Sequence, residues 1–191
     1  MELLGVDDPL PERPGRVLVA GTSGAGKTTL CRQVSQILAL PYTELDSLHH
    51  GPNWVPRASF ADDVERLTAQ PRWVCEWQYA AVRTLLAERA DLLVWLDPPH
   101  RTVMRQVITR TLGRRLRREV LWNGNTEGPL HTFFTDPDHI VRWAWRHRHG
   151  TAVKVSALQE VRPELPVVRL HNRGQVRRWC GHLHRYQPDV L

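Results

Sequence analysis

Long apolar runs and lysine are the two features that are most nearly missing from this sequence. No stretch reaches the roughly 18 uncharged apolar residues of a membrane-spanning helix, so we expect no integral membrane segment. The three cysteines, Cys31, Cys75 and Cys180, lack metal-ligand spacing, and we expect reduced, buried thiols. The acidic segment 1–8 has neither the basic region nor the cleavage pattern of a secretory signal, and we expect a cytoplasmic protein.

Positive charge is carried almost entirely by arginine. Of 26 basic residues only Lys27 and Lys154 are lysines, and the formal net charge is +6. Arginine side chains suit the phosphate oxygens of a small ligand, and a basic surface can also bind nucleic acid nonspecifically. Composition alone leaves both alternatives open. The length of 191 residues predicts a single domain over 1–191, large enough to bury a core.

The most specific motif is a phosphate-binding loop. It follows an apolar segment, 16–20, precedes an amphipathic stretch, 30–40, and reads Gly21-Thr22-Ser23-Gly24-Ala25-Gly26-Lys27-Thr28-Thr29, a full match to Gly-x-x-x-x-Gly-Lys-[Ser/Thr]. Loop N–H groups and the helix N-terminus would bind phosphates. Lys27 would contact the β- and γ-phosphates, and the Thr28 hydroxyl would bind Mg²⁺. The sequence therefore predicts ATP and Mg²⁺ binding, and no Asn-Lys-x-Asp signature for guanine is present.

Apolar segments and helical patterns alternate along the rest of the chain. The expected strands are 16–20, 41–46, 72–76, 91–97 and 166–170, and the expected helices are 30–40, 59–69, 79–90, 100–118 and 175–186. This alternation predicts an α/β fold of the P-loop NTPase type, with a five-stranded parallel sheet and helices on both faces. Residues 119–165 give the weakest pattern, with one tryptophan- and arginine-rich helix expected near 138–148 and an irregular return after it.

Two carboxylates are expected at the ends of strands, where ligands bind in such sheets. Glu76 would hold Mg²⁺ directly or through water, and the alternative is that it caps a neighbouring turn. Asp46 would orient an acceptor hydroxyl and take its proton, although Mg²⁺ ligation would explain it as well. Because a phosphate acceptor needs no such base, Asp46 favours a hydroxyl acceptor.

Several segments together carry a resemblance to a known family. They are Glu44–His50 with Asn53-Trp54, Arg72–Tyr79, Ala90–Pro99, Arg110–Arg115, Glu119–Glu127 and Phe133-Phe134. With the phosphate loop, they resemble the adenylate-kinase-like P-loop proteins labelled "DNA topology modulation" proteins, over about residues 16–180. The resemblance implies a nucleotide-kinase core with an arginine-rich lid at about 110–135, and it leaves the acceptor undefined.

The chain departs from that family after the third expected strand. The usual Asp-Gly-Asn-Tyr is replaced by Glu76-Trp77-Gln78-Tyr79, in which two side chains are one methylene longer and Trp77 stands in place of glycine. We expect Trp77 to fill space near the acceptor, and we expect an altered or weakened acceptor pocket.

Arginines supply the remaining candidates. Arg110 and Arg114 fall four residues apart on one helix face, where a nucleotide-kinase lid would offer them to the transferring phosphoryl group; a solvated basic face is the alternative. Arg57 and Arg83 are candidate contacts of the acceptor substrate. Asn172, after the last strand, would contact the adenine ring or form a turn before the last helix.

The leading hypothesis is an ATP- and Mg²⁺-dependent phosphotransferase that acts on a nucleotide or another small molecule. The alternative is a nucleotide-dependent regulatory or nucleic-acid-binding ATPase, suggested by the basic stretches 101–118 and 142–149. No DNA-reading motif accompanies them, so nucleic acid is not the favoured partner. Simple hydrolysis of the triphosphate is a third hypothesis, and the sequence does not predict the oligomeric state.

Overall fold

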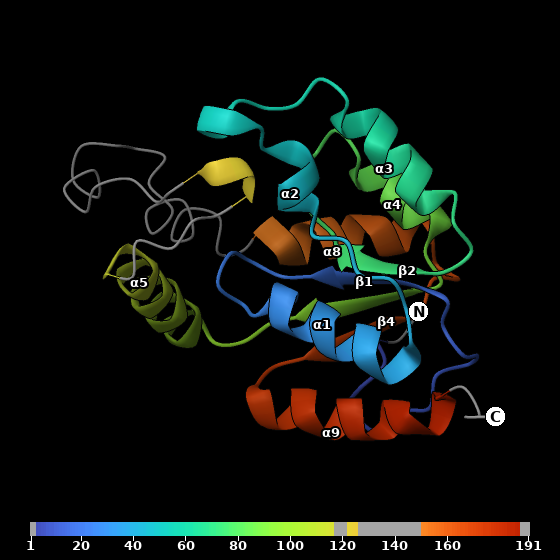
Figure 1. The fold of residues 1–191 in the computed structure, drawn as a ribbon. Helices are drawn as coiled ribbons and strands as arrows, with labels where there is room; N and C mark the ends of the chain where they lie inside the picture. The colour runs from blue at the N-terminus through green and yellow to red at the C-terminus, as the bar shows by residue number, and fades with distance from the viewer. Residues whose placement is uncertain (1–2, 117–121, 126–149, 188–191) are drawn as a thin grey trace.

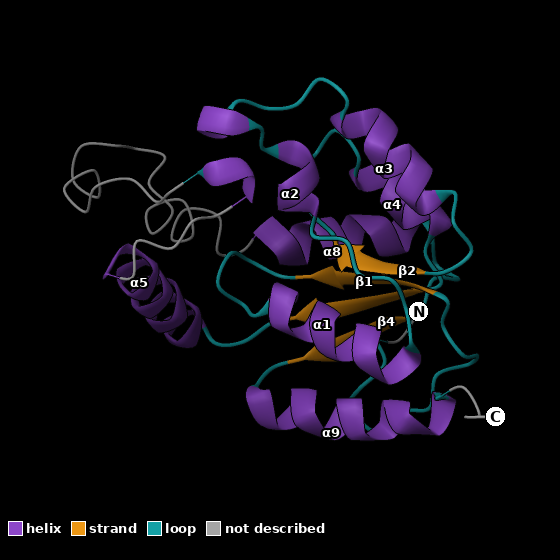
Figure 2. Ribbon diagram, viewed as in Figure 1, coloured by secondary structure: helices purple, strands orange, loops and turns teal. Residues whose placement is uncertain are grey.

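The computed structural model describes residues 3–116, 122–125 and 150–187. Its centre is a parallel sheet of four strands, β1 (Arg16–Ala20), β2 (Trp73–Glu76), β3 (Leu92–Leu96) and β4 (Val167–Leu170). The strand order is β2-β1-β3-β4, so the chain crosses over between neighbours (Figures 1 and 2). These strands are buried on both faces, which explains why each is a nearly continuous apolar run in the sequence.

Helices cover both faces of the sheet (Figure 1). On one face α1 (Lys27–Leu38) and α9 (Arg173–Leu183) pack on Val17, Val19 and neighbouring residues. The other face is covered by α2 (Leu45–His49), α3 (Phe60–Thr68), α4 (Arg83–Arg89) and α8 (Gly150–Val161), which pack on Leu18 and its neighbours. Because side chains alternate along a strand, β1 contributes to two separate cores.

The helix α5 (His100–Leu116) leaves the carboxyl edge of the sheet after β3 (Figure 1). Three short 3₁₀ turns complete the described part: η1 (Pro52–Trp54), η2 (Trp122–Gly124) and η3 (His184–Tyr186). No helix among the described residues is long and apolar enough to cross a membrane. The three cysteines are buried free thiols, as expected.

The predicted fifth strand is wrong. Instead of pairing over 41–46, the chain forms one isolated bridge between Tyr42 and Val74, beside β2. The helix α2 then begins at Leu45, whose N–H donates to the Glu76 carboxylate at 3.4 Å. Asp46 sits in the first turn of that helix, where the helix dipole favours a negative charge. A single bridge between Leu4 and Val168 lies beside β4.

The other differences concern helix boundaries and the region around the lid. The helix expected over 79–90 begins only at Arg83, and α8 replaces the irregular return expected before 165. Of the expected lid, 110–116 and 122–125 are described, whereas 117–121 and 126–135 lie outside the described residues. The basic stretch 142–149 lies outside them too, and the extent of the domain, 1–191, stays a prediction.

Candidate active site

The phosphate loop joins the carboxyl end of β1 to the first turn of α1. Gly24 and Gly26 have φ angles of +83° and +103°, in the left-handed region that glycine adopts without strain. A Cβ at Gly24 would overlap the side chain of Val107, so the loop packs directly against α5. The first turn of α1 contains no acidic residue and no side-chain cap, which leaves the positive end of this helix directed at the loop.

Lys27 is the electrostatic centre of the predicted site. Its Nζ donates to the Thr22 carbonyl at 3.4 Å. Burial lowers the pKa of Lys27, and the carboxylates of Glu76 and Asp46 partly offset that effect. The charge of Arg110 lowers the same pKa further. Four residues predicted from separate parts of the sequence therefore act on one another in the fold.

Glu76 and Thr28 offer oxygen ligands beside the loop. The Thr28 hydroxyl donates to Glu76 Oε1 at 3.2 Å, and the Tyr42 hydroxyl donates to the same oxygen at 2.7 Å. Glu76 is only 2% exposed, and within the described residues no arginine or lysine forms an ion pair with it. A buried carboxylate next to a hydroxyl at a phosphate site is the donor set that Mg²⁺ prefers. These two residues therefore fit the metal.

Asp46 is held by the segment that departs from the resembled family. Gln78 Nε2 donates to Asp46 Oδ1 at 2.6 Å, and the Tyr79 hydroxyl donates to the same oxygen at 2.5 Å. Tyr79 has a φ of +60°, a strained conformation for an aromatic residue, and its ring stacks on His49 at 4.1 Å. Burial and the nearby Asp46 raise the pKa of Tyr79, so its phenol keeps its proton. The departure thus supplies two donors to one carboxylate.

Trp77 fills space in the protein core, and its effect on the acceptor pocket stays a prediction. Its side chain is 7% exposed and packs into the core beneath α4, and its Nε1 donates to the Arg83 carbonyl at 3.1 Å. Trp77, which is larger than the glycine of the resembled family, therefore holds the first residue of α4 through this hydrogen bond.

Among the predicted arginines, Arg110 reaches the phosphate loop. Its Nη2 donates to Ser23 Oγ at 3.4 Å across the contact between α5 and the loop. The side chain of Arg114 lies outside the described part, although its backbone belongs to α5. Arg57 forms an ion pair with Asp63 at 3.1 Å, and its acceptor role stays a prediction. Arg83 lies with its guanidinium 5.8 Å from the Trp77 ring centre.

Two solved kinases have a fold similar to that of this chain. The chain is similar to a gluconokinase from Sinorhizobium meliloti 1021, with a TM-score of 0.51 and 20% identity over 91% of this chain and 93% of that chain. It is also similar to a shikimate kinase from Acinetobacter baumannii in complex with shikimate, with a TM-score of 0.54 and 16% identity over 87% and 89%. No protein-family model and no curated protein matches the sequence. The fold is that of P-loop kinases.

At the same carboxyl edge of the sheet, Asn172 caps α9. Its side-chain oxygen accepts a hydrogen bond from Gln175 N at 2.9 Å at the start of α9. The turn that the sequence offered as an alternative is therefore present, and an adenine contact stays a prediction. Gln106, which the sequence did not single out, lies between this helix and the loop; with its amide turned, it bonds the Gly24 carbonyl at 2.5 Å and Arg173 at 3.3 Å.

Sequence reasoning also missed the role of the short segment Trp122–Asn125, named here the 122–125 segment. Asn125 is 5% exposed, donates to the Gly51 carbonyl at 2.9 Å and accepts from Trp54 N at 3.1 Å. Asn123 donates to the His50 carbonyl. The 122–125 segment is therefore bound to the loop that follows α2. The signal was present in the sequence, because this block is a specific part of the family resemblance.

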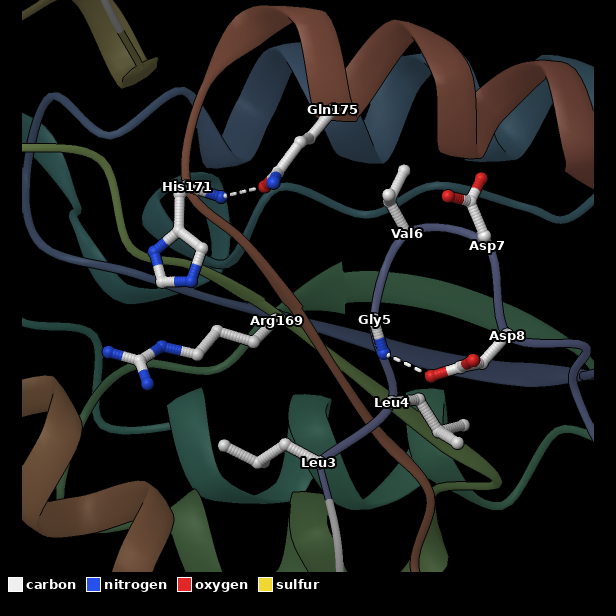
Figure 3. A pocket seen from close by; sticks show the side chains of 9 residues that line it. All are labelled: Leu3, Leu4, Gly5, Val6, Asp7, Asp8, Arg169, His171 and Gln175. Atoms are coloured by element: carbon white, nitrogen blue, oxygen red, sulfur yellow. Dashed lines mark hydrogen bonds between the residues drawn. The ribbon is translucent and has the colours of Figure 1, made fainter.

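Two cavities lie near the carboxyl edge. One, of about 330 Å³, is lined by Thr22 of the loop, the end of β3 and Thr151 of α8. The other, of about 480 Å³, lies between segment 3–8 and the end of β4 (Figure 3). In it Gly5 N–H donates to Asp8 and His171 N–H to Gln175, so these polar groups are already bonded. None of the predicted site residues lines the larger cavity, and we place the active site at the phosphate loop because the converging charged groups lie there.

Proposed function

We propose that this chain is an ATP- and Mg²⁺-dependent kinase that transfers the γ-phosphoryl group to a hydroxyl of a small molecule. The observation that carries the proposal is the Asp46 carboxylate, which Gln78 and Tyr79 hold within electrostatic reach of Lys27. A kinase with a phosphate acceptor relies on cations and positioning and has no need of a base there.

Each part of the site has a definite task in this reaction. The loop N–H groups and Lys27 bind the triphosphate, and Thr28 with Glu76 would hold Mg²⁺, which neutralises developing charge when bound. Asp46 accepts the proton of the acceptor hydroxyl as its oxygen bonds to the γ-phosphorus. The bond from that phosphorus to the β–γ bridging oxygen breaks, and ADP leaves. Arg110, which already reaches Ser23, contacts the transferring group.

The fold relatives support a small acceptor. One is named a gluconokinase, and the other was solved with shikimate bound. Neither likeness identifies the acceptor of this chain, because both sequence identities are at or below 20%.

A phosphoryl-transfer screen tests the proposal. The protein is incubated with γ-labelled ATP, Mg²⁺ and a panel of hydroxyl metabolites, nucleosides and nucleoside monophosphates, and labelled products are separated. We expect Lys27→Ala to abolish transfer and Asp46→Asn to lower kcat about 10²–10⁴-fold, the contribution of a general base. Asp62→Asn, an exposed carboxylate on α3, is the matched control and keeps full activity.

Three outcomes count against the proposal. A nucleoside diphosphate product that forms equally well in Asp46→Asn would assign a phosphate acceptor. Inorganic phosphate as the sole product would assign hydrolysis. Full activity in Lys27→Ala would remove the phosphate loop from the reaction.

A further inference from the structure

The partners of the Asp46 carboxylate bind only one of its two oxygens. Gln78 Nε2 donates to Oδ1 at 2.6 Å, and the Tyr79 hydroxyl donates to the same oxygen at 2.5 Å. Within the described residues, no hydrogen bond or ion pair reaches Oδ2. Oδ2 is therefore the oxygen that can accept a proton from a bound hydroxyl, and the bonds at Oδ1 set the direction in which Oδ2 points.

Tyr79 has one hydroxyl proton and two neighbours that could accept it. Its oxygen lies 2.5 Å from Asp46 Oδ1 and 3.2 Å from His50 Nε2. The carboxylate is the closer and the stronger acceptor, so the proton lies on the bond to Asp46. The contact with His50 is then a hydrogen bond only if Nε2 carries a hydrogen and donates it to the Tyr79 oxygen. Charged His50 has this hydrogen, and so does one of its two neutral tautomers.

His49 contacts the other ring nitrogen of His50. The two Nδ1 atoms lie 3.4 Å apart, and the rings meet edge to face. Burial and the neighbouring His50 lower the pKa of His49, although the charge of Asp46 opposes this effect, so His49 is neutral at neutral pH. When His50 is neutral with its hydrogen on Nε2, its Nδ1 is an acceptor, and His49 donates to it from Nδ1. The hydrogen bonds then run in one direction, from His49 through His50 and Tyr79 to Asp46.

Packing holds Tyr79 in a backbone conformation that an aromatic residue disfavours, with a φ of +60°. Its ring stacks on that of His49, with an angle of 16° between the two planes. The edge of Phe60 packs against it, with 5.1 Å between the ring centres. These contacts come from the last residue of α2 and the first residue of α3. The surroundings therefore fix the Tyr79 hydroxyl between Asp46 and His50.

We propose that His50 is a positioning residue for the catalytic base. Its Nε2–H holds the Tyr79 hydroxyl, which in turn holds Asp46 Oδ1, so that Oδ2 is left to take the proton of the acceptor hydroxyl. The inference rests on the proposed kinase function and adds a residue that sets the rate of proton transfer. No proton travels along the chain: the hydroxyl proton goes to Oδ2, and Tyr79 and His50 keep their own. Enzymes commonly orient a base through such a third group.

The hydrogen positions are measured first, on the free protein. Nitrogen-15 NMR of the histidine rings, at a pH about two units above the ordinary histidine pKa, shows which ring nitrogen carries the hydrogen. We expect the Nε2–H tautomer for His50 and the Nδ1–H tautomer for His49, with signals assigned by their loss in His50→Gln and His49→Gln. Tyr79→Phe removes the acceptor, so His50 should then show a mixture of tautomers. A wild-type His50 with its hydrogen on Nδ1 overturns the proposal, because Nε2 then has nothing to donate.

Kinetics are measured next, with the hydroxyl acceptor that the phosphoryl-transfer screen labels. We expect His50→Leu to lower kcat about 3- to 10-fold, the loss of one hydrogen bond between neutral groups, and to leave the KM of ATP unchanged. His50→Gln should restore most of the lost kcat, because its amide can donate from the place of Nε2 and never carries a charge. His184→Leu, the same change at an exposed histidine, is the matched control and keeps the wild-type kcat. Equal losses in His50→Leu and His50→Gln contradict the role as a donor.

A double-mutant cycle shows whether His50 acts through Tyr79. Tyr79→Phe should lower kcat about 10- to 100-fold, because a hydrogen bond to a charged group is lost. In that background His50→Leu has no hydroxyl to act on, so the double variant should have the kcat of Tyr79→Phe alone. Losses that multiply would show that His50 acts by another route.

The NMR and kinetic results separate this inference from the proposed function. If the tautomers are as expected and Asp46→Asn keeps full kcat, the proposed base is wrong although the chain of hydrogen bonds exists. If Asp46→Asn loses activity and His50→Leu does not, the base stands and the positioning role of His50 is wrong. If no acceptor is labelled, the kinase proposal fails, and the tautomers alone decide whether His50 holds Tyr79.

Discussion

Lys27 is buried among groups of both signs, so its protonation responds to what the phosphate loop binds. In the free protein, burial lowers its pKa below the ordinary value of 10.5. Bound polyphosphate places negative charge against the ammonium and raises that pKa. Between the lowered and the raised pKa, nucleotide binding must therefore take up protons, and the uptake disappears at lower pH, where Lys27 is charged in both states.

We expect this uptake to appear when the binding of Mg²⁺·ADP is measured by calorimetry on the alkaline side of neutrality, in buffers of different ionisation enthalpy. Lys27→Arg is the matched control, because arginine stays charged throughout and its variant binds nucleotide without proton uptake. Equal uptake in both proteins would show that another group titrates.

Glu76 carries a charge whose effect on nucleotide binding should change sign with the metal. With Mg²⁺ present, its carboxylate and the Thr28 hydroxyl would hold the ion, and we expect Glu76→Gln to weaken ADP binding about tenfold, or 1.4 kcal/mol. Without Mg²⁺, the same carboxylate repels the phosphates, so the variant should bind ADP as well as the wild type or better. Both affinities are measured by titration of the intrinsic tryptophan fluorescence.

Tyr42→Phe is the control for Glu76, because it removes a hydrogen bond to Oε1 and leaves the negative charge in place. This variant should keep the wild-type response to Mg²⁺. If Glu76→Gln weakens ADP binding equally with and without the metal, the carboxylate has a structural role only.

Individual elements show which parts of the fold the sequence determines locally. The strands β1, β2, β3 and β4 lie within one residue of the expected bounds, because continuous apolar runs between turn residues are a strong local signal. The prediction of a strand over 41–46 is wrong because the structure of this segment depends on a residue that is distant in the sequence. The Leu45 N–H donates to Glu76, which is 31 residues away. The helix α4 begins at Arg83 and not at the predicted residue 79 for the same reason, because the Tyr79 hydroxyl donates to the distant Asp46.

The site residues also differ in whether their positions depend on local sequence or on contacts between distant segments. Lys27, Thr28 and Gly24 belong to one contiguous motif whose geometry is local, and they lie in the loop and in the first turn of α1. The partners of Asp46 come from a separate segment of the chain, and no spacing in the sequence links them to Asp46.

The 122–125 segment should stabilise the loop after α2 more than it stabilises the sheet. Asn125 satisfies both the Gly51 carbonyl and the Trp54 N–H in a buried position. Asn125→Ala removes both of these buried hydrogen bonds, and the loss of a buried hydrogen bond costs about 1–3 kcal/mol. We expect faster hydrogen exchange at residues 51–57, measured by mass spectrometry, and unchanged exchange in β1 and β3.

Asn123→Ala provides the comparison within the same segment, because Asn123 is exposed and water can replace its bond to the His50 carbonyl. Its effect on exchange should be smaller. Equal effects from the two variants, or faster exchange in the sheet, would mean that the 122–125 segment supports the fold as a whole.

The topology itself couples the phosphate loop to the entire chain. The loop begins at the end of β1, which pairs with both β2 and β3, and ends in α1, which packs on α9 across the core. Because β1 contributes side chains to both cores, the loop has its binding geometry only when the two layers of helices are in place. Nucleotide binding should therefore oppose global unfolding, rather than the opening of one segment.

This coupling gives a quantitative expectation for thermal unfolding. At a concentration 100 times its Kd, Mg²⁺·ADP stabilises the folded state by about 2.7 kcal/mol, which corresponds to a rise in Tm of about 5–11 °C for a chain of this size. Lys27→Ala should lose the shift because the loop no longer binds the phosphates. Asp62→Asn should keep it in full, because this exposed carboxylate on α3 is not one of the candidate site residues. A shift of the same size in Lys27→Ala would place nucleotide binding elsewhere, and its loss in Asp62→Asn would show that the shift does not depend on the phosphate loop alone.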